Sequence, residues 1–259
     1  MMMNIDLNSD LGEGYGPWSL GDDAALLELV SSANVACGGH AGDPATMFST
    51  LRRAGENSVT VGAHPGYADR TGFGRRVIPM RPEEAGWMIA AQIGALQAMA
   101  ALAGTRVQYV KPHGALANLA ADDTELARAL AKAIRAVSPN LAVLAISGTA
   151  LAHAAREAGL TTFSEIFADR AYLPDGRLVP RDREGAVLHE PEAAANRLLA
   201  FLDSGLMPVQ GGAPVRLAAD SICVHGDSPH ALHMARGIRT RLLKAGITIT
   251  PFLPPAGPS

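Results

Sequence analysis

Short apolar runs recur along this chain and alternate with helix-like segments. Most of these runs are continuously apolar, which is typical of strands that are covered on both faces of a parallel sheet. The runs lie at residues 3–8, 33–37, 58–63, 106–111, 141–146, 161–166 and 220–225. They predict about seven parallel strands.

Helix starts and ends lie between these runs. The first predicted helix has Asp43 as its N-cap, Pro44 at its first position and Gly55 after its end, which are residue types favoured there. Further helices are predicted to begin at Pro82, after Asp122-Asp123, at Pro191 and after Ser228-Pro229, with ends near Gly104, Gly205 and Gly246.

Strands and helices thus alternate without a low-complexity linker, which predicts an α/β fold. Seven strands are enough for closure, so we expect a TIM-like (β/α) barrel of about seven parallel strands, with a doubly wound open sheet as the alternative. Residues 1–253 are assigned to this single barrel domain and residues 254–259 to a short tail.

Two polar segments break the alternation. Residues 168–190 contain Asp175-Gly176, a strong hairpin-turn pattern, and residues 205–219 carry Gly211-Gly212 between two short β-prone pieces. Both follow the end of a strand or helix. They are candidates for a lid over a site, with surface decoration as the alternative.

Composition narrows the class of protein. The net charge of -3 and the 5% of aromatic residues offer neither a basic face nor a stacking platform for nucleic acid. Cys37 and Cys223 lie in apolar runs, as expected for buried thiols in a reducing compartment. The N-terminus lacks the pattern of a secretory signal. The most apolar helix-like stretch, residues 88–103, is interrupted by two glutamines and is expected to be too short to span a bilayer. These features predict a soluble cytoplasmic protein.

Ionisable side chains follow most of the apolar runs, as in the stretch VKPHGAL at residues 110–116. The carboxyl ends of parallel strands meet on one face of a barrel, so these side chains are expected to converge there. The candidate catalytic residues are Asp10, Glu13, His40, His64, Lys111, His113, Glu165, His225 and Asp227, with Asn8, Asp43, Asp69 and Asp169 at the same strand ends. The other histidines, His153, His189, His230 and His233, lie in helical or polar segments and are interpreted as solvated or structural.

Three kinds of chemistry suit such a ring of side chains. Asp10, His40 and His64 could hold a divalent metal, Mg²⁺ or Zn²⁺, that activates water. The carboxylates and imidazoles could instead perform metal-free acid–base chemistry on an amide or ester. The lining could also bind a small anion, with Lys111 and an arginine of the stretch DRTGFGRR as counter-charges. Neither a G-x-S-x-G elbow nor a P-loop pattern is present.

Six longer stretches carry a family resemblance. LNSDLGEGYG, ANVACGGHAGDP, VGAHPGYADRTGFGRR, VKPHGALAN, EIFADRAYLPDGRLVPR and ICVHGDSPHA occur in family order and extend to about residue 231. In these stretches the chain resembles the LamB/YcsF family over nearly its whole length.

The resemblance implies a seven-stranded (β/α) barrel related to the glycoside hydrolase and deacetylase barrels. It also implies the 5-oxoprolinase reaction, the ATP-dependent ring opening of 5-oxoproline (pyroglutamate) to L-glutamate, with this chain as one of three components beside 5-oxoprolinase subunits B and C. In deacetylase barrels an Asp of the first strand and two histidines hold the metal, and Asp10 and His64 lie in similar stretches here.

Two other functions stay open. One is a metal-dependent deacetylase or amidohydrolase acting on a small N-acyl or sugar substrate. The other is a non-catalytic component that binds the substrate. With Lys111 as the only strand-end lysine, the mouth is expected to carry few cations, and the isolated chain is expected to have an open, solvated cleft that partner subunits complete.

Overall fold

The structure is a computed structural model that describes residues 3–226 and 231–255. Seven parallel strands close into a barrel: β1 (Asn4–Leu11), β2 (Ser32–Ala36), β3 (Thr60–His64), β4 (Val107–Val110), β5 (Ala142–Ile146), β6 (Thr162–Phe167) and β9 (Ser221–Val224). The ring closes because β9 pairs in parallel with both β6 and β1. The predicted TIM-like barrel is confirmed, and the doubly wound open sheet is excluded.

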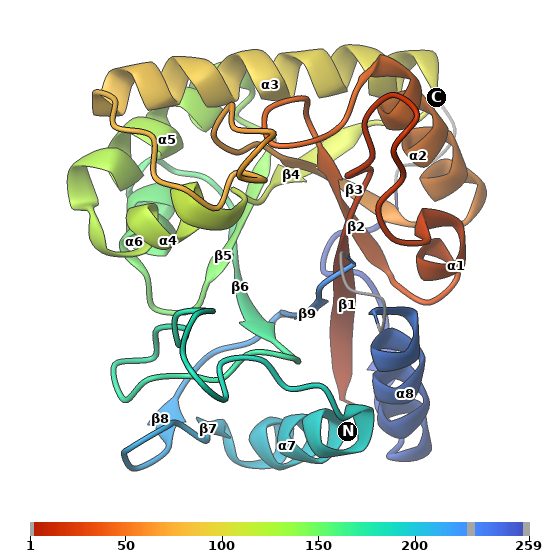
Figure 1. The fold of residues 1–259 in the computed structure, drawn as a ribbon, viewed down its shortest axis with the longest axis vertical. Coiled ribbons are helices and arrows are strands. Elements are labelled where there is room, and N and C mark those ends of the chain that lie inside the picture. The colour runs from red at the N-terminus through yellow and green to blue at the C-terminus, as the bar shows by residue number, and fades with distance from the viewer. Residues whose placement is uncertain (1–2, 227–230, 256–259) are drawn as a thin grey trace.

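Helices surround the strands, with α3 along one side of the molecule and α7 and α8 at the opposite side (Figure 1). Their bounds are α1 (Asp23–Leu27), α2 (Pro44–Glu56), α3 (Pro82–Leu102), α4 (Gly114–Asp122), α5 (Thr124–Val137), α6 (Ala150–Glu157), α7 (Pro191–Ser204) and α8 (Ala231–Lys244). The predicted starts at Pro44, Pro82 and Pro191 are confirmed, and Asp123 caps α5. The predicted start at Ser228-Pro229 lies outside the described residues.

The first strand extends further than its apolar run. The sequence pattern ended it at residue 8, whereas β1 continues to Leu11, so that Asn8 and Asp10 lie inside the strand. Both side chains are buried, and both accept hydrogen bonds from Asn34 Nδ2 across the β1–β2 pair, at 2.7 and 2.9 Å. Polar residues can therefore continue this strand because the barrel interior supplies their hydrogen-bond partners.

The end of the barrel away from the carboxyl ends of the strands is closed by aromatic side chains. Phe252 packs against Tyr109, with ring centroids 5.0 Å apart, and against Phe163, at 4.6 Å. The hydroxyl of Tyr109 donates to Asn34 Oδ1 at 2.7 Å, which joins this aromatic plug to the polar interior. A ligand of the barrel therefore enters from the carboxyl ends of the strands.

The two polar excursions fold as short β-structure. In residues 168–190, the amide of Gly176 donates to the Leu173 carbonyl at 2.9 Å, which confirms the predicted turn. In residues 205–219, β7 (Leu206–Met207) pairs antiparallel with β8 (Val215–Arg216). The last strand, β10 (Thr248–Ile249), pairs with β1 outside the ring.

Helix α3 is longer than the apolar stretch suggested. Its 21 residues meet the length and composition of a membrane span, so the expectation that this stretch is too short is wrong, although only 33% of its most apolar window is buried. Its Ile89, Ile93 and Leu96 are fully buried in the core. The core helices of water-soluble proteins meet the same length and composition criterion.

The glutamine that interrupts the apolar face of α3 has a structural task. Gln92 Nε2 donates to the Gly66 carbonyl at 2.7 Å, and Gln92 Oε1 accepts from the Gly66 amide at 3.1 Å. Gly39 lies against the same side chain, since a Cβ there would come within 2.5 Å of Gln92 Oε1. Gln92 thus joins the loop after β2 to the loop after β3.

Replacing Gln92 by leucine should lower the free energy of unfolding by about 2 kcal/mol, because it leaves two buried backbone groups of Gly66 without partners. The matched control is Gln97→Leu on the same helix, where the half-buried side chain should tolerate the change within about 0.5 kcal/mol. Urea unfolding followed by circular dichroism measures both. Equal stability of the two variants would contradict this role of Gln92.

Candidate active site

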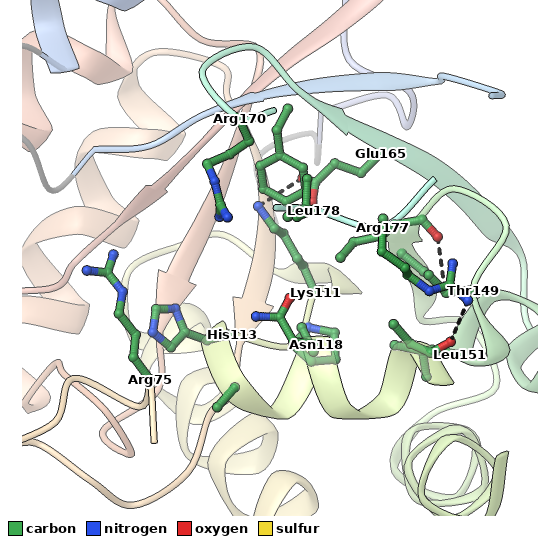
Figure 2. Close-up of a pocket in the computed structure, with 18 of the residues that line it drawn as sticks. Arg75, Lys111, His113, Asn118, Thr149, Leu151, Glu165, Arg170, Arg177 and Leu178 are labelled. Atoms are coloured by element: carbon green, nitrogen blue, oxygen red, sulfur yellow. Dashed lines mark hydrogen bonds and ion pairs between the residues drawn. The ribbon is translucent and has the colours of Figure 1, made fainter. Parts of the chain in front are cut away.

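A cavity of about 430 Å³ lies at the carboxyl ends of the strands (Figure 2). Six of the predicted strand-end residues line it, namely Asp10, His64, Lys111, His113, Glu165 and His225. They come from five different strand ends, and those of β1 and β9 are joined directly where Ser9 Oγ donates to the Val224 carbonyl at 2.7 Å. The expected convergence on one mouth of the barrel is therefore confirmed for these side chains.

Lys111 lies at the centre of a buried charge cluster. Its Nζ is 3.0 Å from Asp10 Oδ1 and 2.8 Å from Glu165 Oε1. The same ammonium group lies 3.1 Å from Cys223 Sγ and 3.3 Å from Asn8 Oδ1. Only 4% of Lys111 is exposed, so these contacts replace the water that the ammonium group loses.

The two carboxylates of this cluster differ in their protonation. Burial acts to raise the pKa of Asp10, but the charges of His64 and Lys111 outweigh it and hold that pKa well below its usual value. Burial raises the pKa of Glu165, and Lys111 offsets this only in part. Burial acts to lower the pKa of Lys111, yet Asp10 and the neighbouring acidic groups raise it well above its usual value. The cluster therefore holds a charged lysine, an ionised Asp10 and a Glu165 that takes up a proton more readily.

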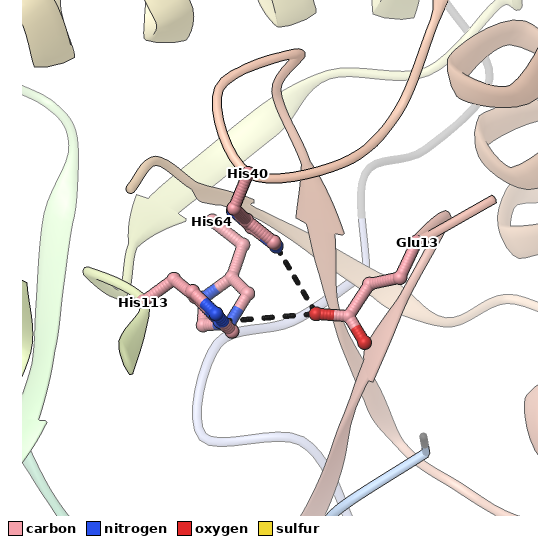
Figure 3. Close-up of side chains that lie close together, drawn as sticks. All are labelled: Glu13, His40, His64 and His113. Atoms are coloured by element: carbon pink, nitrogen blue, oxygen red, sulfur yellow. Dashed lines mark hydrogen bonds and ion pairs between the residues drawn. The ribbon is translucent and has the colours of Figure 1, made fainter. Parts of the chain in front are cut away.

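A second cluster, which we call the histidine cluster, consists of Glu13, His40, His64 and His113 (Figure 3). One ligand atom of each side chain lies within 4.8 Å of the others, and all four residues are buried. His40 Nε2 is 3.1 Å from Glu13 Oε1, and His113 Nδ1 is 3.7 Å from the same oxygen. The rings of His40 and His113 stack with centroids 3.6 Å apart.

Backbone carbonyls fix the tautomers of two of these rings. His64 Nδ1 faces the Lys111 carbonyl oxygen at 2.6 Å, and His113 Nε2 faces the Phe73 carbonyl oxygen at 2.8 Å. A carbonyl oxygen only accepts, so both of these ring nitrogens carry the hydrogen. The remaining nitrogens, His64 Nε2 and His113 Nδ1, face each other at 3.0 Å.

Two lone pairs that face each other at this distance need a positive species beside them, either an extra proton or a metal ion. Burial and the neighbouring His64 lower the pKa of His113 to about 3, and burial with the neighbouring His113 lowers the pKa of His40 well below its usual value. His40 Nδ1 is also buried, without a hydrogen-bond partner among the described residues. The donor set of three imidazoles and one carboxylate fits a metal ion.

The metal ligands predicted from the sequence match this cluster only in part. His40 and His64 belong to it, whereas Asp10 Oδ1 lies 3.4 Å from His64 Nε2 and already accepts from Lys111 and Asn34. Glu13 and His113 complete the set instead. The spacing of residues in the sequence could not reveal this set of ligands, because it does not show that the Asp10 carboxylate forms an ion pair with Lys111.

A glycine-rich turn holds the histidine cluster in place. At Gly74, with φ of 62°, a Cβ would come within 2.7 Å of His40 Cβ and 2.9 Å of His113 Cδ2. The adjacent Phe73 ring meets both imidazoles edge to face, with centroids 5.4 and 5.3 Å apart. The stretch TGFG therefore packs on the histidines, and only a glycine fits at position 74.

His225 forms a separate pair with Asp169. Its Nδ1 lies 2.9 Å from both carboxylate oxygens, and the ring stacks on Phe167. Burial acts to raise the pKa of Asp169, but His225 outweighs it and lowers that pKa. Arg197 supports this strand end by donating to three backbone carbonyls, those of Phe167, Ala168 and Arg170. The half-buried His225 is thus oriented toward a cavity that it lines.

Two expectations about the mouth are wrong. The cavity is lined by four arginines beside Lys111, namely Arg75, Arg170, Arg177 and Arg181. The mouth is therefore rich in cationic side chains, not poor in them. The cleft is also not openly solvated, because His64 is fully buried and Asp10 is only 7% exposed. The cause is the same in both cases: the excursion of residues 168–190 folds over the mouth and contributes three of the arginines.

The other strand-end candidates do not reach the cavity. Asp43 caps α2 by accepting from the amides of Ala45 and Thr46, and Asp69 pairs with Arg76. His153, His189 and His233 are exposed, as expected for solvated residues. Asp227 and His230 lie outside the described residues.

Comparison with known proteins places this geometry in a family. A protein of Pseudomonas syringae pv. tomato that is named as a 5-oxoprolinase component of the A type is 53% identical over 251 residues, which cover 97% of this chain and 98% of that protein. The crystal structure of a lactam utilization protein from Thermus thermophilus superposes with a TM-score of 0.90 at 42% identity, over 96% of this chain and 99% of that one.

A more distant structure shares the fold alone. It is that of a putative cellobiose-phosphate cleavage protein from Enterococcus faecalis, with a TM-score of 0.60 at 12% identity, covering 97% of this chain and 98% of that one. The LamB/YcsF family pattern matches residues 5–256. From this match and the 53% identity, the chain belongs to the LamB/YcsF family.

Proposed function

We propose that this chain is the A-type component of a 5-oxoprolinase, which opens the ring of 5-oxoproline to L-glutamate at the expense of ATP. The observation that carries the proposal is the 53% identity, over nearly the full length of both chains, to a protein that is named as this component. The name of the structural relative, a lactam utilization protein, fits a substrate that is a cyclic amide.

The chemistry explains why ATP is needed. A five-membered lactam is barely strained and its amide is stabilised by resonance, so hydrolysis alone gains little driving force. Transfer of the terminal phosphoryl group of ATP to the lactam oxygen releases ADP and makes the ring carbon electrophilic. One water then adds to that carbon and the C–N bond breaks, with a proton going to nitrogen. A second water releases phosphate and leaves the side-chain carboxylate of glutamate.

The side chains of the cavity suit these steps. The Lys111 ammonium, fixed by Asp10, lies where it stabilises negative charge that develops on the substrate. Glu165, whose pKa is raised by burial, provides a proton for the leaving ring nitrogen. His225, oriented by Asp169, accepts the proton of the attacking water. Leu144, Ile146 and Phe167 give the ring an apolar wall.

The histidine cluster is the proposed metal site. Its three imidazoles and one carboxylate suit Zn²⁺ better than Mg²⁺, which prefers oxygen ligands. Bound there, zinc would supply Lewis-acid chemistry and lower the pKa of a coordinated water. Glu13 and the carbonyls of Lys111 and Phe73 orient the imidazoles for that task.

We further propose that ATP is used together with partner subunits B and C and that the protein acts in the cytoplasm. The name of the relative, which describes one subunit among several, supports an assembly. Cys37 and Cys223 are buried free thiols, as expected in a reducing compartment.

A second candidate function is a metal-dependent amidohydrolase or deacetylase that needs no ATP. The histidine cluster favours it, because such a site hydrolyses amides without phosphorylation. The two functions differ in their requirement for ATP, which the first of the following experiments measures.

The isolated chain should release no glutamate from 5-oxoproline and ATP, whereas the chain reconstituted with subunits B and C should release it. The sequence has no P-loop, and phosphoryl transfer requires the nucleotide and the acceptor to be held in line. A coupled glutamate assay measures this. Full turnover by the chain alone would overturn the need for partners, and ATP-independent hydrolysis would favour the amidohydrolase.

Asp10→Asn should lower turnover of the reconstituted enzyme by about 100-fold or more, because Lys111 loses the carboxylate that orients it. It should also cost about 3 kcal/mol of stability, since a buried charge loses part of its compensation. The control is His233→Ala, an exposed residue of α8, which should change neither quantity. Turnover measured below the unfolding temperature separates the two effects, and a similar loss in His233→Ala would show that the site is misplaced.

Protein purified without an affinity tag should contain near-stoichiometric zinc by elemental analysis. His64→Ala and His113→Ala should each lose most of it, because each removes a ligand from the histidine cluster. His153→Ala, at an exposed position of α6, should retain it. A metal-free protein that stays fully active in chelator would contradict the metal site.

A further inference from the structure

The substrate of the proposed reaction carries a charge that the reaction does not change. 5-Oxoproline is a five-membered lactam with a carboxylate on the ring carbon next to nitrogen, so the carboxylate and the lactam oxygen lie on opposite sides of that nitrogen. Lys111, Glu165 and His225 suit the lactam group. A carboxylate that enters a buried cavity needs a cation and hydrogen-bond donors of its own.

The arginines of the cavity lining differ in burial. Of the four within the described part of the chain, only Arg170 is buried, with 5% of its surface exposed. Arg75 and Arg181 are exposed. Arg177 is half-buried, and its Nε lies 2.6 Å from Asp122 Oδ1. Arg170 is therefore the arginine of this lining that lies deepest in the cavity.

The backbone holds the Arg170 guanidinium in one orientation. Its Nη2 donates to the Val179 carbonyl at 2.6 Å, and its Nε donates to the Ala186 carbonyl at 3.3 Å. The carbonyl of Arg170 itself accepts from Arg197 Nη1 at 2.7 Å, which fixes the backbone at this position. A ligand of this guanidinium would thus meet a group that is already oriented, which lowers the entropic cost of binding.

These contacts leave part of the guanidinium for a ligand. Among residues 3–226 and 231–255, no carboxylate forms an ion pair with Arg170, because both carboxylate oxygens of the adjacent Asp169 lie 2.9 Å from His225 Nδ1. Burial and the charge of Arg181 lower the pKa of Arg170 to about 10. Two of its five N–H groups are used by the two carbonyls, so Nη1 and the second hydrogen of Nη2 offer two parallel donors.

Arg170 and Lys111 serve the same cavity. Figure 2 shows both side chains pointing into it. Lys111 Nζ lies 2.8 Å from Glu165 Oε1 and 5.4 Å from the centre of the Phe167 ring, so this ammonium group lies at the end of the strand that leads to Arg170. One small molecule can therefore contact Lys111 with one end and Arg170 with the other.

We propose that Arg170 binds the carboxylate of 5-oxoproline and so makes the cavity specific for acidic lactams. The inference rests on the proposed function and adds the residue that recognises the unreactive end of the substrate. A guanidinium binds a carboxylate through two parallel, charge-assisted hydrogen bonds, and this geometry also fixes the orientation of the ligand. With its carboxylate at Arg170, the substrate has its lactam group turned toward Lys111 and Glu165.

The first test is calorimetric titration of the full chain with 5-oxoproline and with 2-pyrrolidinone, which is the same lactam without the carboxylate. Wild type should bind 5-oxoproline about 10- to 100-fold more tightly, as expected for hydrogen bonds to a charged group. Arg170→Gln should bring the two affinities within about threefold of each other by weakening the binding of 5-oxoproline. Arg170→Lys keeps the charge without the two parallel donors and should give an intermediate ratio.

The second test separates binding from a structural role of Arg170. In the enzyme reconstituted with subunits B and C, Arg170→Gln should raise KM for 5-oxoproline about tenfold or more and lower kcat less than about threefold, because Arg170 holds a group that does not react. The control for both tests is Arg183→Gln, an exposed arginine of the same excursion outside the cavity lining, which should behave as wild type.

Three results would overturn the proposal: equal affinity of wild type for the two lactams, a wild-type affinity ratio and KM in Arg170→Gln, or a loss of kcat in that variant without a rise in KM. If Arg170→Gln does not fold, Arg170→Lys decides, and a wild-type ratio there overturns the proposal. A failure of the proposed function is a different result, namely no glutamate from wild type on reconstitution, whereas the titrations still show whether Arg170 selects the acidic lactam.

Discussion

The burial of the Lys111 ammonium group is the constraint on which the rest of the barrel interior depends. Taking such a charge out of water costs several kcal/mol, and the cost is recovered only if carboxylates and hydrogen-bond acceptors surround it. Asp10, Glu165, Asn8 and Cys223 provide them. This is why an otherwise apolar α/β protein has polar side chains inside its first strand, and why Asn34 bridges Asn8 to Asp10.

Lys111 also links the two clusters through its backbone. The side chain organises the charge cluster, and the carbonyl of the same residue fixes the tautomer of His64 in the histidine cluster. A shift of the β4 end would therefore disturb both clusters at once. The glycine turn at Gly74 and the Gln92 amide oppose such shifts by holding the loops that follow β2 and β3. Packing in the core thus fixes the positions of the side chains that form the site.

The sequence predicts which strand ends form this site better than it predicts which side chains contact each other there. Continuous apolar runs define strands locally, and barrel closure brings their ends together whatever the details, so the convergence of Asp10, Lys111 and His225 could be predicted. The contacts between these side chains depend on distances across the barrel, and the spacing of residues along the sequence does not encode those distances. For that reason Glu13 and His113 could not be assigned to the histidine cluster, and Arg181 could not be placed at the mouth, since it belongs to an excursion without periodicity.

Under the proposed function, the same arrangement explains how wasteful hydrolysis is avoided. Water must stay away from the terminal phosphate of ATP until the lactam oxygen has accepted it, and the buried cluster of Asp10, Lys111 and Glu165 is a dry environment in which fixed charges act strongly. The exposed Arg75 and Arg181 lie at the rim of that environment, where solvent still has access. A partner protein that covers this rim would exclude water from the cavity. Assembly would then switch the chemistry on, because the rim of the cavity loses its access to solvent only when the complex has formed.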